Sequence, residues 1–458
     1  TTSLGASWIE IAPNTNNGNT WIVATGSGEW HKNYDLSNGI WRTTDAGASW
    51  QPISMGTEMV TNFEYFWEDV RIRKFWMNQD DPEVIVVASN KGVYKTTNAL
   101  EPNPNDVTWE KVLEPSIHLL EGDAIEEEIF IDIIQKPDDV NELYVSGTSA
   151  IYWSHDMGDT WELLPNITPE NNQLMYPTDP NKKAQRIALR TTAANPNLLY
   201  IFTALKYPGY QIYDSKFEFA LFNRTDYSII NYHNGEDNYA PYRSQAVAVS
   251  PIDESIIYYG NAKKMKKLKL NLNGETITST NLFSVNKDWH DDIHYLKFAS
   301  DNQSIWMAHD GGIAKGIPIE ETDDSMIFNW QNYYSGLGVS NLYNMASSES
   351  KPTNLLYGAQ DTGCNIKIGT NNWKEVNLGD GYAVKFHPSY PNISFVSSQN
   401  YFRGSLDNGN TFDYLYDFDQ GHGYHMDFNH QNDNILYSKG NYGVKEVKFN
   451  NLPYSLTD

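Results

Sequence analysis

Apolar and polar positions alternate in short runs along the whole chain, and the runs are separated by turns rich in Pro, Asp, Asn and Gly. Alternation with a period of two predicts β-strands, and the 3.6-residue periodicity of amphipathic helices is almost absent. One phrase recurs throughout: a turn, a Leu or Ile, an aromatic residue and a short β-prone run, as in NTWIVATG, ELYVSG, IIYYGN and ILYSKG. Such recurrence is typical of a repeat protein.

The recurring phrase divides the chain into nine units. Its marker positions lie about 52 residues apart on average: Trp21, Ile85, Tyr144, Tyr200, Tyr258, Trp306, Tyr357, Phe395 and Tyr437. That spacing is typical of one four-stranded β-propeller blade with its loops. In the third unit the four strands are expected in IFIDIIQ, ELYVSG, AIYWSHD and TWELLP.

We therefore predict an all-β protein, a single large β-propeller of four-stranded antiparallel blades. Nine repeat units are counted, and seven to ten blades are compatible with the pattern. One domain is expected over residues 1–458, without a separate second domain. The ninth unit lacks a clear outer strand, so either the strand around Trp8 helps to close the ring or the chain continues.

Three turns between third and fourth strands share the pattern S/T-x-D-x-G-x-S/T-W/F, which is known as the Asp box. They are centred on Asp45, Asp156 and Asp407. In such a turn the carboxylate accepts backbone N–H groups, the glycine takes the positive-φ position, and the aromatic side chain fills the gap between blades. We expect all three boxes to be structural, on the face away from ligand sites.

Composition narrows the function classes. The chain has 33 Lys and Arg against 58 Asp and Glu, a net charge of −25, which argues against nucleic acid or an anionic membrane as a partner. The sequence contains no run of 18 apolar residues, so it predicts no membrane-spanning segment. The single cysteine, Cys364, excludes an internal disulfide framework and a multi-cysteine zinc site, and a buried inert thiol is expected. The high aromatic content suggests a secreted or cell-surface bacterial protein, whose signal peptide would already be removed.

Several phrases add a family resemblance: WHDDIHY, HDGGIAKG, WQNYYSGLGVSNLY, GAQDTG and LGDGYAVKFHP. With the Asp boxes, they make the chain similar to the bacterial BNR/Asp-box glycosyl-hydrolase-like proteins. That group resembles the sialidases, the xyloglucan-cleaving propellers and the sortilin (VPS10) propeller. The resemblance implies a propeller, secretion, and carbohydrate or peptide ligands. The chain lacks the Arg-Ile-Pro of sialidases, the second propeller of xyloglucanases and the Cys-rich modules of sortilin.

Second-to-third-strand turns and blade-to-blade crossovers are expected to open on one face, opposite the Asp boxes. Long loops on one side of a rigid scaffold commonly carry function, and sugars bind by stacking on aromatic faces and by hydrogen bonds to carboxylates and amides. The candidate substrate-binding residues on this open face are Glu29, Trp30, His31, Trp67, Tyr239, Tyr242, Trp289, His290, Gln360 and His422.

Hydrolysis of a glycosidic bond needs two carboxylates, one protonated and one ionised. Asp310, Asp361 and Asp380 are the catalytic candidates, because they come from consecutive units and stand beside tight glycine turns (DGG, QDTG, GDG). Asp before Gly is also ordinary turn chemistry, which is the alternative interpretation. We expect Asp361 and Asp380 to lie within reach of one ligand.

Two further clusters have a binding and a structural interpretation. Arg71, Arg186 and Arg243 begin inner strands, where they would bind an anionic sugar or, the preferred interpretation, neutralise nearby acids. Asp291, Asp292 and His294 would hold Ca²⁺ or another divalent cation, or His294 would lock blade contacts. No other cofactor is required.

The first functional hypothesis is a propeller that recognises a polysaccharide or oligosaccharide and hydrolyses it. The second is a non-catalytic, sortilin-like propeller that binds a peptide or a surface polymer. The third is a polysaccharide lyase, for which His290, Tyr239 and Arg243 would be the natural candidates. The sequence indicates no oligomeric state.

Overall fold

The computed structural model describes most of the chain. The described residues are 6–25, 39–53, 72–115, 117–119, 125–127, 129–148, 150–165, 183–206, 216–233, 246–260, 265–274, 276–284, 293–321, 325–333, 342–377, 379–398, 401–417, 425–440 and 443–449. Within them the only helices are two short 3₁₀ turns, η1 (Asn16–Gly18) and η3 (Pro104–Asp106). No helix in these ranges has the length and apolar character needed to cross a bilayer.

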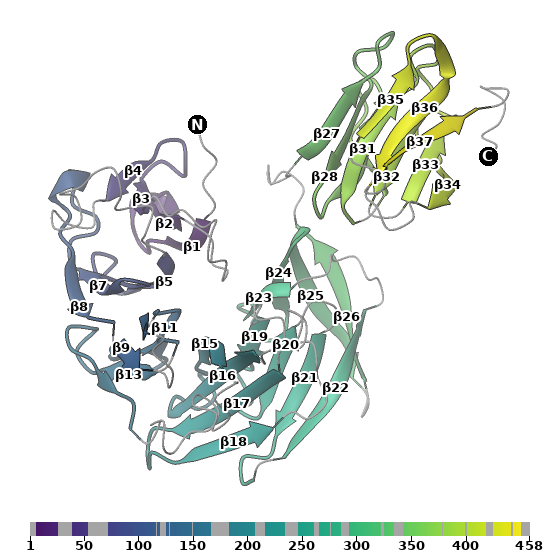
Figure 1. Ribbon diagram of the computed structural model, residues 1–458. Coiled ribbons are helices and arrows are strands. Elements are labelled where there is room, and N and C mark those ends of the chain that lie inside the picture. The colour runs from purple at the N-terminus through teal and green to yellow at the C-terminus, as the bar shows by residue number, and fades with distance from the viewer. Residues whose placement is uncertain are drawn as a thin grey trace. The chain divides into compact units, whose positions relative to one another are not determined.

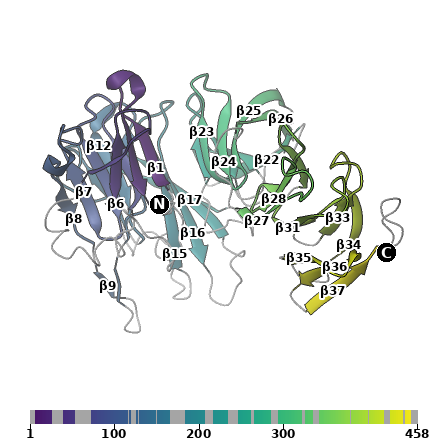
Figure 2. The same cartoon turned by 90° about the horizontal axis from the view of Figure 1, so that it is seen from above.

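The first four blades are separate antiparallel sheets whose strands follow one another in chain order (Figure 1). Blade 1 contains β1 (Ala6–Ile11), β2 (Trp21–Thr25), β3 (Ile40–Thr43) and β4 (Gln51–Ile53). Blade 2 contains β5 (Ile72–Met77), β6 (Ile85–Ser89), β7 (Gly92–Thr96) and β8 (Glu110–Leu113). Blade 3 contains β11 (Asp132–Lys136), β12 (Asp139–Ser146), β13 (Ile151–Ser154) and β14 (Glu162–Leu163). Blade 4 contains β15 (Lys183–Arg190), β16 (Leu198–Lys206), β17 (Lys216–Asn223) and β18 (Ile229–His233). Of these, β15, β16 and β17 lie side by side in both views (Figure 2).

Blades 5 and 6 share one eight-stranded sheet. Blade 5 contains β19 (Ala246–Val249), β20 (Ile256–Gly260), β21 (Met265–Leu270) and β22 (Ile277–Ser284). Blade 6 contains β23 (Ile293–Phe298), β24 (Ile305–His309), β25 (Gly312–Glu321) and β26 (Ser325–Asn332). The outer strands β22 and β26 pair in parallel, which joins the two blades at their outer edges.

The last three blades follow the same plan. Blade 7 contains β27 (Leu342–Ser347), β28 (Leu355–Ala359), β29 (Gly363–Lys367) and β30 (Lys374–Asn377). Blade 8 contains β31 (Gly381–Phe386), β32 (Ser394–Ser398), β33 (Tyr401–Ser405) and β34 (Asp413–Asp417). Blade 9 has three described strands, β35 (His425–Asn429), β36 (Asn432–Gly440) and β37 (Gly443–Lys448).

The predicted fold class is confirmed: the described chain is all-β, and its repeated four-stranded antiparallel sheets are the blades of a β-propeller. All nine marker residues lie in the second strands of their blades, and the four strands of the third unit lie where they were expected. The strand around Trp8 is β1, the inner strand of blade 1, where it pairs with β2. One crossover that was expected to be a loop contains a short hairpin, β9 (Ile117–Leu119) with β10 (Ile125–Glu127).

The chain divides into two compact units. Unit 1 consists of Thr1–Lys287, Asp291–Ala308 and Lys315–Gln331, and therefore holds blades 1 to 5 and most of blade 6. Unit 2 consists of Asp288–His290, His309–Ala314 and Asn332–Asp458, and therefore holds blades 7 to 9 with the β24–β25 hairpin of blade 6. The single continuous domain expected from the sequence stays a prediction.

A buried ion cluster joins the inner strands of unit 1. Asp132 of β11 accepts hydrogen bonds from Lys74 Nζ of β5 at 2.6 Å, and from the Leu189 amide and Arg190 Nη1 of β15 at 2.9 and 3.0 Å. Arg190 Nε donates to the Val247 carbonyl of β19 at 2.7 Å. We call Lys74, Asp132 and Arg190 the inner-strand triad.

Two aromatic rings extend the inner-strand triad to the first and sixth blades. The Lys74 ammonium lies 4.8 Å from the centroid of the Trp8 ring of β1, and that ring meets Tyr295 of β23 edge to face at 5.7 Å. All six blades of unit 1 therefore contribute an inner strand to one set of contacts. Because the charges are paired and hydrogen-bonded, burying them is compatible with a stable fold.

The three Asp-box turns have the same hydrogen bonds. In blade 3, Asp156 accepts from the Thr160 amide at 2.9 Å, from Thr160 Oγ1 at 2.6 Å and from Ser154 Oγ at 2.7 Å. Asp45 and Asp407 accept the equivalent three bonds in blades 1 and 8. Hydrogen bonds from Ser49 and Thr43 lower the pKa of Asp45 to about 2. Each carboxylate thus holds its own turn closed.

Blade 2 contains a fourth turn of this kind that the sequence pattern did not reveal. Asn98 takes the place of the aspartate and accepts from Thr96 Oγ1 at 3.0 Å and from the Thr108 amide at 2.9 Å. Nine residues, 99–107, separate this Asn from the Thr108-Trp109 pair, an insertion of six relative to the three residues in the other boxes. Arg42 of blade 1 donates to the Ala99 and Glu101 carbonyls, so the insertion is tied to the neighbouring blade.

We expect Asp156→Ala to lower the free energy of unfolding by roughly 1–3 kcal/mol, because it leaves turn donors without their acceptor. Asp156→Asn should cost less, since Asn98 serves the same purpose in blade 2. Denaturant unfolding monitored by tryptophan fluorescence measures both. Neither variant should change ligand binding; a variant that folds normally but loses binding would refute the structural assignment of these turns.

Candidate functional site

Asp361 and Asp380, the two central carboxylate candidates, come together in unit 2. Asp361 lies at the tip of the β28–β29 hairpin of blade 7, and Asp380 directly precedes β31 of blade 8. The Asp361 amide donates to Asp380 Oδ1 at 2.9 Å, and the Tyr382 hydroxyl donates to Asp380 Oδ2 at 3.1 Å. Both oxygens of Asp380 therefore accept a hydrogen bond, and the orientation of that carboxylate is fixed.

The tip of the hairpin is tightly wound. The Thr362 amide donates to the Gln360 carbonyl at 2.7 Å, which closes a three-residue turn with Asp361 at its centre. Asp361 has φ of 57°, a conformation that few non-glycine residues adopt and that Asp tolerates better than most. The turn leaves the Asp361 side chain half-buried and the Gln360 side chain exposed.

Two glycines explain why these segments meet. A Cβ on Gly381 would lie 2.3 Å from the Gly363 carbonyl oxygen, and a Cβ on Gly358 would lie 2.5 Å from the Tyr382 carbonyl oxygen. The backbone at the start of β31 therefore passes directly against the β28–β29 hairpin, which only glycine permits at both points. This close approach brings Asp380 to the Asp361 amide.

An exposed aromatic ring stands beside the carboxylates. Tyr343 of β27 is 45% exposed, and its ring stacks on Tyr382 with 5.2 Å between centroids and 24° between planes. Tyr382 is buried and donates to Asp380, so one buried ring links Asp380 to an exposed one. We call Asp361, Asp380, Tyr343 and Tyr382 the carboxylate–tyrosine cluster.

Asp310 lies at the tip of the β24–β25 hairpin and is exposed. His309, beside it, is buried, and its Nδ1 accepts a hydrogen bond from the Gly311 amide at 3.1 Å. This hairpin belongs to unit 2, together with the carboxylate–tyrosine cluster. The hairpin that carries Asp310 and the hairpin that carries Asp361 each connect the second strand of a blade to the third. The two aspartates therefore occupy equivalent ends of their blades.

Many of the predicted site residues lie outside the described residues: Glu29, Trp30, His31, Trp67, Arg71, Tyr239, Tyr242, Arg243, Trp289, His290, Asp291, Asp292 and His422. Arg186 lies in β15, where only its backbone is described. His294 is half-buried in β23. In the described ranges no group of three or more His, Cys, Asp or Glu side chains could hold a metal ion. The proposed cation site stays a prediction, because two of its three residues are not described.

Cys364 in β29 is fully buried, and its thiol donates to the Ser397 carbonyl at 3.4 Å. Burial raises the pKa of this thiol to about 12, so it is protonated at neutral pH. A protonated buried thiol is neither a nucleophile nor a metal ligand.

The sequence analysis missed the charged groups that meet at the inner strands, Lys74, Asp132 and Arg190. It also missed Tyr343 and Tyr382 as neighbours of the carboxylates. One signal for the tyrosines was present, because WQNYYSGLGVSNLY and LGDGYAVKFHP are both among the family-like phrases.

No protein-family model matches the chain, and no curated protein does so. Several solved structures do match the chain. The GH74 xyloglucanase from Xanthomonas campestris matches over 98% of this chain and 67% of its own, with a TM-score of 0.61 at 12% identity. A GH74 enzyme from Niastella koreensis matches over 95% and 62%, with a TM-score of 0.59 at 12% identity. An ancestral GH74 enzyme matches over 98% and 68%, with a TM-score of 0.51 at 14% identity.

The chain thus spans about two thirds of the length of these enzymes. At such low identity the similarity establishes the fold alone, a β-propeller. The propeller fold that the resemblance implies is confirmed.

Proposed function

We propose that this chain is a secreted propeller that binds an oligosaccharide or polysaccharide at the carboxylate–tyrosine cluster and hydrolyses it. The observation that carries the proposal is the contact between Asp361 and Asp380 beside the exposed ring of Tyr343. Sugars present apolar ring faces that stack on aromatic side chains, and their hydroxyls donate to carboxylates.

The two carboxylates have different surroundings, which suits different tasks. Two donors point at Asp380, and hydrogen bonds to a carboxylate favour its ionised form. Asp380 is therefore suited to act as the ionised carboxylate of the pair, which activates water or stabilises the positive charge that develops on the sugar. The proton for the leaving oxygen would come from Asp361 or from Asp310. This chemistry requires no cofactor.

Non-catalytic binding is the second candidate function, and one observation favours it. Both oxygens of Asp380 are already engaged, one by a backbone amide and one by a phenol. If those bonds persist with ligand bound, Asp380 shapes the hairpin and the site only binds. A glycan-array screen followed by a reducing-end assay on the best ligand separates the two functions, because only hydrolysis releases new reducing ends.

Tyr343→Ala should weaken glycan binding by about tenfold, the loss expected when one stacked ring is removed. Trp373→Ala is the matched control. Trp373 is 43% exposed, close to the 45% of Tyr343, but it stands in the β29–β30 turn at the opposite end of blade 7. Titration calorimetry with the array ligand measures both. Equal losses in the two variants, or none in Tyr343→Ala, would exclude this cluster as the binding site.

A further inference from the structure

Arg403 of β33 is a half-buried cation in blade 8. Among the described residues no carboxylate or carbonyl accepts a hydrogen bond from it, and its Nε is buried without a partner. Of its nitrogens, Nε alone is both buried and unpartnered, so the two Nη groups keep access to the surface. A donor in this condition is costly to the fold unless a molecule from outside the protein supplies the acceptor.

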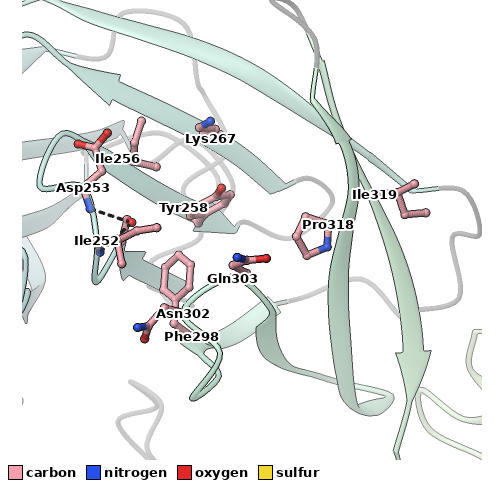
Figure 3. A pocket seen from close by; sticks show the side chains of 11 residues that line it. Ile252, Asp253, Ile256, Tyr258, Lys267, Phe298, Asn302, Gln303, Pro318 and Ile319 are labelled. Atoms are coloured by element: carbon pink, nitrogen blue, oxygen red, sulfur yellow. Dashed lines mark hydrogen bonds between the residues drawn. The ribbon is translucent and has the colours of Figure 1, made fainter.

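The other arginines whose side chains are described are all engaged. Arg42 donates to two backbone carbonyls, and Arg190 and Arg224 each pair with a carboxylate. Arg73 has an interaction of its own, and so has Lys267, which lines a cavity of about 430 Å³ between blades 5 and 6 (Figure 3). In a chain with 58 Asp and Glu against 33 Lys and Arg, a half-buried arginine without an acid is an exception.

Two exposed tyrosines stand beside this arginine. Tyr401 precedes it by two residues in β33, and the centroid of its ring lies 6.0 Å from Arg403 Cζ. Tyr414 of β34 pairs with Arg403 across the strands, so their side chains stand on the same face. The two rings are 45% and 53% exposed and meet edge to face, with 6.3 Å between centroids. We call Tyr401, Arg403 and Tyr414 the Arg403 site; it combines a guanidinium with exposed aromatic surface.

The Arg403 site lies at the same end of blade 8 as Asp380. Gly381, which directly follows Asp380, pairs with Ser398, and Ser398 pairs with Tyr401. Adjacent strands lie about 4.8 Å apart, so Tyr401 stands about 10 Å from the start of β31. The Arg403 site and the carboxylate–tyrosine cluster are therefore close enough for one oligosaccharide to contact both.

Both sites are also on the side of blade 8 that faces blade 7. Arg403 pairs with Val396, which belongs to one core cluster with Leu356 of blade 7. A Cβ on Gly381 would point at the Gly363 carbonyl oxygen of blade 7. A glycan bound at the carboxylate–tyrosine cluster can thus reach the Arg403 site by running outward along one side of blade 8.

We infer that the Arg403 site binds an acidic sugar unit of the glycan, an inference that rests on the function proposed above. The guanidinium pairs with the carboxylate of a uronic acid through two parallel N–H bonds, and the tyrosine rings cover the apolar face of the sugar. In a chain whose net charge is −25, attraction for an acidic glycan has to come from a local cation. Asp361 and Asp380 repel a second acid, so the unit at the carboxylate–tyrosine cluster is a neutral one.

The test uses the whole chain on an array of galacturonate, glucuronate and mannuronate oligosaccharides, each beside its carboxyl-reduced, neutral counterpart. We expect at least one acidic member to bind about tenfold more tightly than its counterpart, the effect of one charge-assisted contact. Arg403→Met keeps an apolar stem and should reduce binding of that member to the level of the neutral one. Lys439→Met is the matched control, because it removes an exposed cation from β36 of blade 9; it should change affinity by less than about twofold.

Three further measurements separate a binding role of Arg403 from a structural one. Arg403→Met should not lower the free energy of unfolding in urea, because no acceptor in the protein loses its donor. Arg403→Lys keeps the charge without the planar fork and should keep only part of the preference for the acid. Tyr401→Ala should weaken acidic and neutral members alike, since it removes aromatic surface and leaves the charge.

Equal affinity for acidic and neutral members, or equal losses in Arg403→Met and Lys439→Met, would overturn the inference. If neutral glycans bind and depend on Tyr343 but not on Arg403, the proposed function stands and this inference fails. If acidic glycans depend on Arg403 but not on Tyr343, the Arg403 site binds the acid and the carboxylate–tyrosine cluster is excluded. An array on which nothing binds would overturn both.

Discussion

Asp132→Asn should lower the free energy of unfolding by about 3–5 kcal/mol, the cost of removing one partner from a buried ion pair. The side chain of Asp132 is 9% exposed and faces two cations, Lys74 and Arg190. Asparagine keeps the shape but cannot neutralise them, so two positive charges would stay buried beside each other. Urea unfolding monitored by tryptophan fluorescence measures the loss, because Trp8 lies against Lys74.

The control for this variant is Asp159→Asn. Asp159 also pairs with a lysine, Lys95, at the same 2.6 Å, but the Asp159 side chain is 64% exposed. The Lys95 side chain is only 6% exposed, but water reaches the Asp159 carboxylate and screens the pair, so the loss should be clearly smaller than that of Asp132→Asn. If Asp132→Asn costs no more than Asp159→Asn, the inner-strand triad does not hold the six blades of unit 1 together.

Lowering the pH should reduce the free energy of unfolding of the wild-type protein through protonation of Asp132. Burial by itself raises the pKa of Asp132, but the charges of Lys74 and Arg190 outweigh it, so the pKa lies below the usual value. The stabilisation is therefore complete above the pKa of an unfolded aspartate, near 3.9, and is lost as the pH falls through the lower folded-state pKa. Asp132→Asn should show a shallower loss of stability below about pH 4.

The blade plan could be predicted from sequence because each second strand carries the same local pattern, as Trp21, Tyr144 and Tyr437 illustrate. The turn around Asn98 could not be predicted, because nine residues instead of three separate it from its Thr-Trp pair. The parallel pairing of β22 with β26 could not be predicted from the sequence either. It depends on how two outer strands meet edge to edge, which leaves no alternation signal in either strand.

The structure describes no side chain of Arg71, Arg186 or Arg243, so their place among the inner-strand charges stays a prediction. Arg71, Arg186 and Arg243 were chosen by their place at the start of inner strands, whereas the described charges that meet are Lys74, Asp132 and Arg190. Register shifts interrupt β5 between Ile72 and Lys74, and β15 between Ala184 and Arg186. A bulge changes which side chains share a face, so alternation read from the sequence fails past that point.

The proximity of Asp361 and Asp380 followed from their place in adjacent units, but the use of Asp380 as a backbone acceptor did not. That bond depends on the close approach at Gly381 and Gly358, a packing contact between blades. The same bond gives the two carboxylates different expected behaviour on substitution. Asp380 contributes to the shape of the hairpin, whereas Asp361 contributes its amide to that bond and keeps its side chain for other contacts.

If hydrolysis is the function, Asp361→Asn should lower the rate of glycan cleavage by at least about a hundredfold, the usual worth of a general acid or base. Its stability should be nearly unchanged, because the backbone amide that Asp380 binds remains in place. Asp380→Asn should lose cleavage to a similar extent and also lose about 1 kcal/mol of stability, since asparagine accepts on one oxygen only. A reducing-end assay and urea unfolding measure the two quantities on each variant.

Asp433→Asn is the matched control for both variants. Asp433 is a half-buried carboxylate that accepts from Ser389 Oγ. It lies at the start of β36 in blade 9, at the end away from the hairpin tips. It should lose some stability and no cleavage. Retained cleavage in Asp361→Asn with lost stability in Asp380→Asn would mean that both carboxylates serve the hairpin. The protein would then be a binder whose ligand contacts begin at Tyr343, because that ring is exposed whether or not the acids react.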